Sequence, residues 1–80
     1  MGDGYVGRET VIKVLQRCGV AVSEHGSKDM FILEKGDTVI VEVLGPTVNR
    51  QMIHHLSWKF NVPIHYFYNP NVIFLKNTSS

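Results

Sequence analysis

Three side chains that suit the recognition of an anionic or aromatic ligand recur every fourth residue: Arg50, His54 and Trp58. Residues four apart share one face of a helix, and these three lie opposite an apolar stripe. Arginine pairs with phosphate or carboxylate, and an exposed tryptophan can stack on a base or anchor a protein. Because tryptophan is mostly buried in folded proteins, the alternative is that a neighbouring segment covers Trp58.

The spacing of the histidines and the position of the one cysteine do not favour a metal site or a catalytic role. His54 and His55 are adjacent, so on a helix their side chains point about 100° apart and do not chelate one ion. His65 lies in a separate segment, and no spacing in the sequence joins it to the other two. Cys18 falls on the apolar side of a predicted helix, which is typical of a small core residue. We therefore expect no metal and no other cofactor.

The composition limits the classes of function. The 80 residues carry eight Lys and Arg against seven Asp and Glu, which gives a net charge of +1. This total lacks the strong positive field of a protein that holds nucleic acid by electrostatics alone. Hydrophobic residues make up 44%, enough for one small core. With no apolar run of about 18 residues and one cysteine, we expect a cytoplasmic protein without a membrane segment or disulfides.

Apolar residues at the helical period predict two helices that would position these side chains. The first covers residues 8–18 and ends at Gly19, where a left-handed cap suits glycine. The second covers residues 48–60, with Thr47 as its N-cap and Asn61 as its stop. The apolar stripe of this second helix contains Val48, Met52, Ile53, Leu56 and Phe60.

Three strands are predicted between the helices, at residues 20–22, 30–35 and 38–44. The Gly36-Asp37 pair between the last two is the signal of a type II′ hairpin, which places Lys35 opposite Thr38. Residues that oppose each other share a face of the sheet. The face that we predict to be the core face carries Met30, Ile32, Val39, Val41 and Val43, and the mixed, solvent-exposed face carries Phe31, Leu33 and Ile40 beside Lys35 and Glu42.

The last part of the chain is rich in aromatic residues and predicts a further hairpin, with strands at residues 64–68 and 72–76. Its aromatic side chains could cover the mixed sheet face, or they could bind a protein or a second copy along an exposed edge strand. The candidates for such partner binding are Tyr66, Phe67 and Tyr68.

The predicted element order defines the architecture. It is an α+β two-layer sandwich of a helix, three antiparallel strands and a helix, with a C-terminal strand or hairpin extension. Residues 1–7, with three glycines, are expected to be a flexible leader. Residues 8–76 would form the single domain and residues 77–80 a flexible tail.

The order of helix, three strands and helix is that of double-stranded-RNA-binding domains, and the chain resembles the HicA-type mRNA interferases more closely. The resemblance covers residues 11–67. It rests on a first helix that ends at Gly19, on the turn Gly26-Ser27-Lys28 before a strand with Phe31, and on a glycine-containing hairpin before a second helix. The family's catalytic histidine follows its Gly-Ser pair, but this chain has Lys28 there.

The resemblance implies an RNA ligand, with Arg50 loosely matching a basic residue of the family's second helix. His25 is the nearest substitute for the missing histidine and is a weak candidate for a general base, with Lys28 on a phosphate. The alternative is that both are solvated turn residues.

Three hypotheses of function follow. The first is a non-catalytic binding module for RNA or a protein, with Lys28, Arg50, His54 and Trp58 as contacts. The second is a protein-interaction or self-assembly domain, possible as a homodimer, that uses the aromatic C-terminal segment. The third is a HicA-like ribonuclease with His25 as its base, and the missing histidine makes it the weakest.

Overall fold

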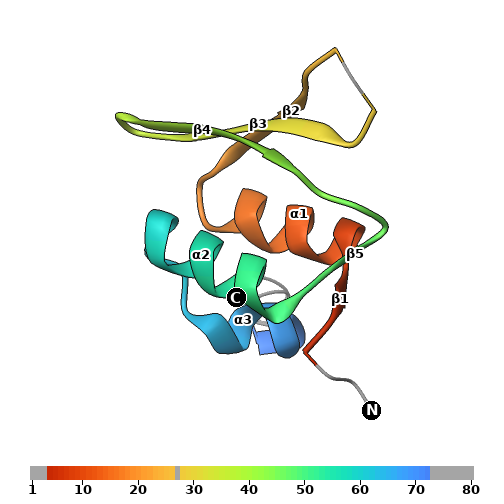
Figure 1. The fold of residues 1–80 in the computed structure, drawn as a ribbon. Helices are drawn as coiled ribbons and strands as arrows, with labels where there is room; N and C mark the ends of the chain where they lie inside the picture. The colour runs from red at the N-terminus through yellow and green to blue at the C-terminus, as the bar shows by residue number, and fades with distance from the viewer. Residues whose placement is uncertain (1–3, 27, 73–80) are drawn as a thin grey trace.

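The computed structural model describes residues 4–26 and 28–72, and it confirms the α+β class. A three-stranded antiparallel sheet lies over a layer formed by two helices, and a third, shorter helix packs beneath them (Figure 1). The elements are β1 (Val6–Gly7), α1 (Arg8–Arg17), β2 (Ala21–Glu24), β3 (Met30–Lys35), β4 (Thr38–Val43), β5 (Thr47–Val48), α2 (Arg50–Phe60) and α3 (Ile64–Tyr68). Among the described residues, no helix is long and apolar enough to cross a membrane.

Helix α1 forms where the apolar period predicts it. Val11, Val14 and Leu15 are fully buried, because the 3.6-residue repeat places them on the side that faces the core. The helix ends at Cys18, and Gly19 then adopts a φ of +92°, a left-handed conformation that glycine takes without steric cost. This turn leads the chain into β2.

Helix α2 begins later than predicted. Thr47 does not cap it but pairs in β5, and the N-cap is Asn49, whose Oδ1 accepts a hydrogen bond from the Met52 N–H at 2.9 Å. Its C-terminal residue Asn61 is left-handed, with a φ of +56°. Asparagine is one of the few side chains that tolerate this conformation, so Asn61 ends the helix as predicted.

The register of the β3–β4 hairpin is confirmed, but the predicted core face is wrong. Lys35 pairs with Thr38, Leu33 with Ile40 and Phe31 with Glu42. Phe31 and Leu33 point into the core, and Val39, Val41 and Val43 lie exposed on the opposite face, which Met30 and Ile32 share and cover only in part. The sheet therefore presents to solvent the face that carries more apolar side chains.

The inner face of the sheet accommodates its charged residues because the helices supply partners for them. The Lys35 ammonium donates to the carbonyl oxygen of Phe60 at 3.3 Å, at the end of α2. The Glu42 carboxylate lies 2.9 Å from Nε2 of His55. These contacts allow the face with the bulky Phe31 and Leu33 to line the core. They cannot be predicted by counting the apolar residues on each face of the sheet.

The N-terminal segment is partly ordered, in contrast to the predicted leader at residues 1–7. Val6 pairs with Val48 in the antiparallel β1–β5 ribbon, and the backbone N–H of Arg8 donates to Pro46. Gly4 is buried with a φ of +88° and accepts a hydrogen bond from the Tyr68 hydroxyl at 2.9 Å. Residues 1–3 and the predicted tail at residues 77–80 lie outside the described residues.

The predicted C-terminal hairpin is wrong for its first strand, because Ile64–Tyr68 forms helix α3. Pro63 precedes this helix as its N-cap, and Ile64 and Phe67 share one side of it. Periodicity cannot separate helix from strand in so short an apolar run, and the aromatic residues favoured the strand. The predicted second strand, residues 72–76, lies outside the described residues except for Val72.

Candidate binding surface

Arg50, His54 and Trp58 all lie on the exposed side of α2, and we call these three residues the α2 stripe. The opposite side of the helix buries Ile53 and Leu56. Trp58 is 80% exposed, so residues 61–72, the described part of the C-terminal segment, do not cover it as the alternative expected. That segment forms α3 on the side of α2 away from the sheet and leaves the tryptophan open (Figure 1).

The part of the sequence that contains the α2 stripe is more positive than the total charge suggests. Residues 1–42 carry five basic and seven acidic side chains, a net charge of −2. Residues 43–80 carry three basic side chains and no acidic one, a net charge of +3. The stripe therefore sits in a stretch of chain without a single carboxylate side chain, a signal that the near-zero total conceals.

Not every cation is available to a ligand. The Arg8 guanidinium binds the Asp29 carboxylate at 2.6 Å and the carbonyl oxygen of Leu44 at 2.8 Å, and it lies 5.6 Å from the ring centroid of Phe31. Arg50, in contrast, is exposed and forms no hydrogen bond or ion pair with any described residue. Arg8 is thus structural, whereas Arg50 is exposed, with part of its side chain against Gly4.

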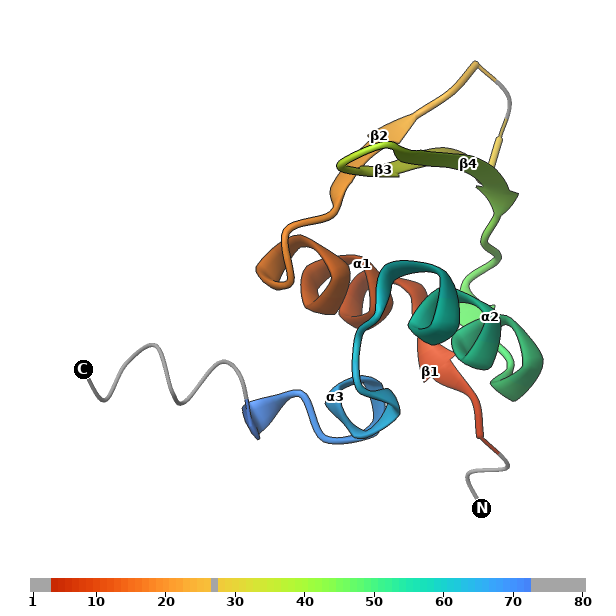
Figure 2. The same cartoon turned by 90° about the vertical axis from the view of Figure 1, so that its left-hand side faces the viewer.

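His25 and Lys28 lie in the β2–β3 loop, which extends beyond the sheet and away from α2 (Figures 1 and 2). The backbone N–H of His25 donates to Met30 at 2.9 Å. Both side chains are exposed, and within the described part of the chain neither has a polar partner. The structure therefore does not bring the two loop residues together with the α2 stripe.

The histidines of the C-terminal half diverge as the helix geometry predicts. His55 turns towards β4 and bonds to Glu42, and His54 points to solvent. His65, on α3, stands edge-on to the Tyr66 ring at a centroid distance of 4.9 Å. Among residues 4–26 and 28–72, no three His, Cys, Asp or Glu side chains gather where they could hold a metal ion.

Cys18 is not an activated nucleophile. Partial burial raises the pKa of its thiol above the usual value, and the nearby Lys35 ammonium only partly offsets this rise. A raised pKa lowers the thiolate fraction at neutral pH, and the thiolate is the reactive form. The expectation of a small core residue fits this position, since the side chain packs against the core cluster.

The three aromatic residues predicted to bind a partner have different surroundings. Phe67 is 1% exposed and belongs to the core, so its predicted role on a partner surface is wrong. Tyr66 is half-buried against the same core. Tyr68 is 40% exposed, but its hydroxyl already holds the carbonyl oxygen of Gly4. Most of this aromatic surface therefore stabilises the fold.

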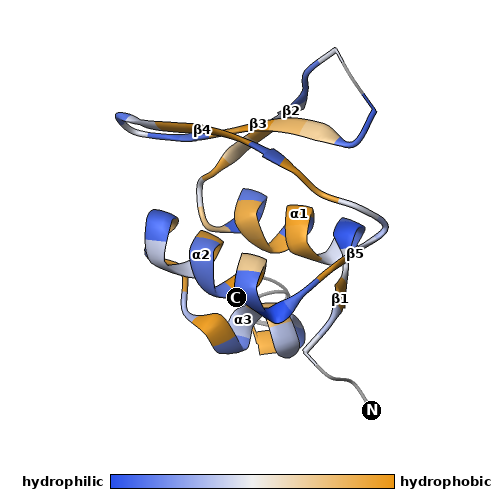
Figure 3. Cartoon of the chain, viewed as in Figure 1, coloured by the Kyte–Doolittle hydropathy of each residue, from blue (hydrophilic) through white to orange (hydrophobic). Residues whose placement is uncertain are grey.

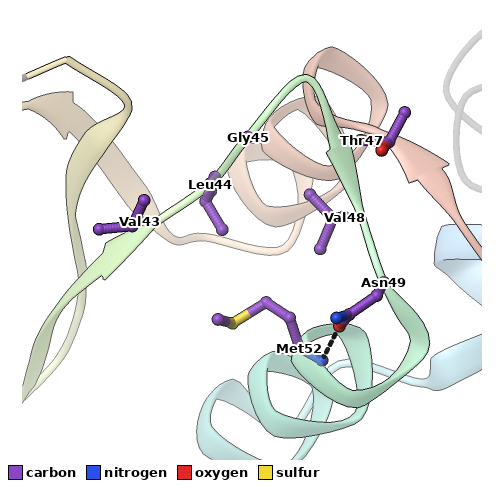
Figure 4. A pocket seen from close by; sticks show the side chains of 7 residues that line it. All are labelled: Val43, Leu44, Gly45, Thr47, Val48, Asn49 and Met52. Carbon is purple, nitrogen blue, oxygen red and sulfur yellow. Dashed lines mark hydrogen bonds between the residues drawn. The ribbon is translucent and has the colours of Figure 1, made fainter.

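A cavity of about 220 Å³ lies where β4, β5 and the start of α2 meet (Figure 4). Its walls include the apolar side chains of Val43, Val48 and Met52. The Asn49 amide is already engaged as the helix cap, and no lining residue is titratable. The cavity thus lacks the acid or base that a catalytic centre needs, and the Thr47 hydroxyl in its lining has no base to activate it.

Comparisons with protein-family models, with curated protein sequences and with solved structures found no significant match to this chain.

Proposed function

We propose that this chain is a small non-catalytic binding module that holds an unpaired stretch of RNA against the α2 stripe. The observation that carries the proposal is the 80% exposure of Trp58 on a helix that also presents Arg50 and contains no carboxylate. The protein would act in the cytoplasm, as the absence of disulfides predicts.

An unpaired base is the ligand that an exposed tryptophan fits best. Single-stranded bases offer both faces for stacking, and each stacked base contributes about 1–3 kcal/mol. From Arg50 to Trp58 the helix rises about 12 Å, so one short strand can reach both residues. Arg50 would pair with a phosphate at one end of the stripe, Trp58 would stack on a base at the other, and His54 would contact the backbone between them.

The same geometry separates the α2 stripe from the residue that the ribonuclease hypothesis uses as its base. Attack by an RNA 2′-hydroxyl needs a general base close to the bound strand. His25, the candidate for that base, lies in the β2–β3 loop and away from the α2 stripe (Figure 1). A ribonuclease of the HicA type would also need a histidine where this chain carries Lys28. The proposal therefore leaves His25 and Lys28 out of the RNA site.

The small number of cations sets the expected affinity. Lys59, which follows Trp58 on α2, is also exposed. If Arg50 and Lys59 each neutralise one phosphate, the slope of log K against log salt is about −1.4. We expect a dissociation constant of about 10–100 µM at low salt, or roughly 6 kcal/mol of binding free energy, of which stacking on Trp58 contributes about 1–3 kcal/mol. Duplex RNA, whose bases are already stacked, should bind more weakly.

The test is the fluorescence anisotropy of a labelled single-stranded RNA titrated with the protein at two salt concentrations. Arg50→Ala should weaken binding about fivefold and reduce the salt slope, because one phosphate contact is lost. Lys13→Ala is the matched control, since it removes the same charge from the exposed side of α1. Equal affinities of the two variants, or no binding by the wild type at low salt, would refute the proposed site.

A further inference from the structure

The face of the sheet that points away from the helices is largely apolar and has no cover. We call it the outer face; it carries Ala21, Ser23, Met30, Ile32, Glu34, Val39, Val41 and Val43, with His25 at its end opposite Met30. The three valines of β4 are 54%, 48% and 59% exposed. Figure 3 shows hydrophobic colour along much of β3 and β4.

This arrangement is unusual for an antiparallel sheet with one covered side. Such sheets normally alternate apolar residues towards the core with polar residues towards water. Strand β4 is also an edge strand, and its outer face has neither a lysine nor a proline to discourage association. An exposed apolar row of this kind marks an interaction surface.

No described segment covers the outer face, and the apolar residues at either end of the chain are too few to reach it. The chain leaves α3 after Tyr68, and the described residues end at Val72, below the layer of α1 and α2 (Figure 2). The three apolar residues 73–75 span at most about 10 Å, and that helical layer alone is about 10–12 Å thick. Gly4 is hydrogen-bonded to Tyr68 of α3 on the same lower side, so the three residues before it are equally short for this span.

The charges at the two ends of the outer face are complementary to those of a second copy. Glu34 lies at the end next to the β3–β4 turn. Lys28 lies at the other end, in the β2–β3 loop with His25. Of the two carboxylates there, Glu24 lies on the inner face opposite Phe31, and Asp29 is paired with Arg8. Consider two outer faces packed together and related by a two-fold axis that lies between them and runs perpendicular to the strands. This rotation reverses the strand direction of the second copy, so Glu34 of each copy lies over the β2–β3 loop of the other. The valines then pack against each other between two opposite-charge contacts.

We propose that two copies of this chain associate through their outer faces as a symmetric dimer with packed sheets. Two sheets packed face to face bury alternate side chains of each, which is the pattern that β4 offers. The face has far fewer residues than the 20–30 per side of a standard interface. We therefore expect a reversible dimer with a dissociation constant of about 10–100 µM. Because α2 lies on the inner side, both copies keep their α2 stripes accessible.

Sedimentation equilibrium over a range of protein concentrations tests the dimer. The wild type should shift from monomer to dimer, and Val41→Glu should weaken association at least tenfold, because a carboxylate would be buried against valines. Val41→Thr retains the β-branched shape and should weaken it several-fold if Val41→Glu fails to fold. Gln16→Glu adds the same charge on the exposed side of α1 and should change nothing.

The two-fold arrangement has its own test. Glu34→Lys and Lys28→Glu should each weaken the dimer, and the double variant should restore it, because each contact regains opposite charges. Glu9→Lys is the control for the change in net charge. A wild type that stays monomeric at every concentration would overturn the proposal. A dimer that survives unchanged in folded Val41→Glu or Val41→Thr would overturn it equally.

Discussion

Replacing Phe67 with alanine is expected to lower the free energy of unfolding by about 3–5 kcal/mol, because the change leaves a cavity where a buried ring stood. Phe67 is 1% exposed and is among the largest fully buried side chains. It belongs to the core that α1 and α2 also line. A domain of this size has a total stability near 5 kcal/mol or little more, so the variant should be largely unfolded.

Urea denaturation followed by circular dichroism measures this effect. The matched control is Tyr68→Phe on the same helix, which removes only the hydroxyl that donates to Gly4 and should cost about 1 kcal/mol. A Phe67→Ala protein as stable as the wild type would show that the ring does not belong to the core. That result would return Phe67 to the set of candidate partner-binding residues.

Leu33→Ala is expected to cost about 2–5 kcal/mol, whereas Val41→Ala should cost less than about 1 kcal/mol. Leu33 is fully buried on the inner face of the sheet, and Val41 is about half exposed on the outer face. The comparison asks directly which face of β3 and β4 forms the core, because both substitutions shorten an aliphatic side chain in the same hairpin.

Chemical denaturation at a protein concentration well below the expected dimer dissociation constant isolates this difference from any association. Similar losses for the two variants, or a larger loss for Val41→Ala, would contradict the assignment of the faces. The sheet would then bury its valine row, as the count of apolar residues alone predicts.

The sequence predicted the structure correctly wherever a few neighbouring residues determine the backbone conformation. The apolar period and Gly19 predict α1, and the Gly36-Asp37 turn predicts the register of β3 and β4. In both cases the backbone preference of a few neighbouring residues determines the outcome. The order of a helix, three antiparallel strands and a helix follows from these signals and agrees with the structure.

The predictions of the core face and of the C-terminal hairpin were wrong because contacts between residues distant in sequence determine both features. Lys35 and Glu42 can lie on the inner face of the sheet because each forms a hydrogen bond with α2. Lys35 bonds to the carbonyl oxygen of Phe60 and Glu42 to His55, and both partners are distant in sequence. The α3 segment carries residues that favour strands, but burying Phe67 under α1 and α2 requires a helix. Neither contact can be read from a short window of sequence, because propensity is weaker than packing.

The candidate site was partly predictable. The four-residue spacing of Arg50, His54 and Trp58 correctly places them on one exposed side of α2. Whether Trp58 is covered depends on the path of the C-terminal segment, in which the predicted first strand is in fact helix α3. The uneven distribution of charge was present in the sequence throughout, but the net total of +1 masks it.

Trp58 is the only tryptophan of the protein, so its own fluorescence reports directly on the proposed RNA site. Titration with a short single-stranded RNA at low salt should quench this fluorescence saturably, with a midpoint of about 10–100 µM, because a stacked base contacts the indole. Added salt should move the midpoint to higher RNA concentrations. Emission that stays unchanged across the whole titration, with the protein shown to be folded, would contradict the assignment of the α2 stripe as an RNA-binding surface.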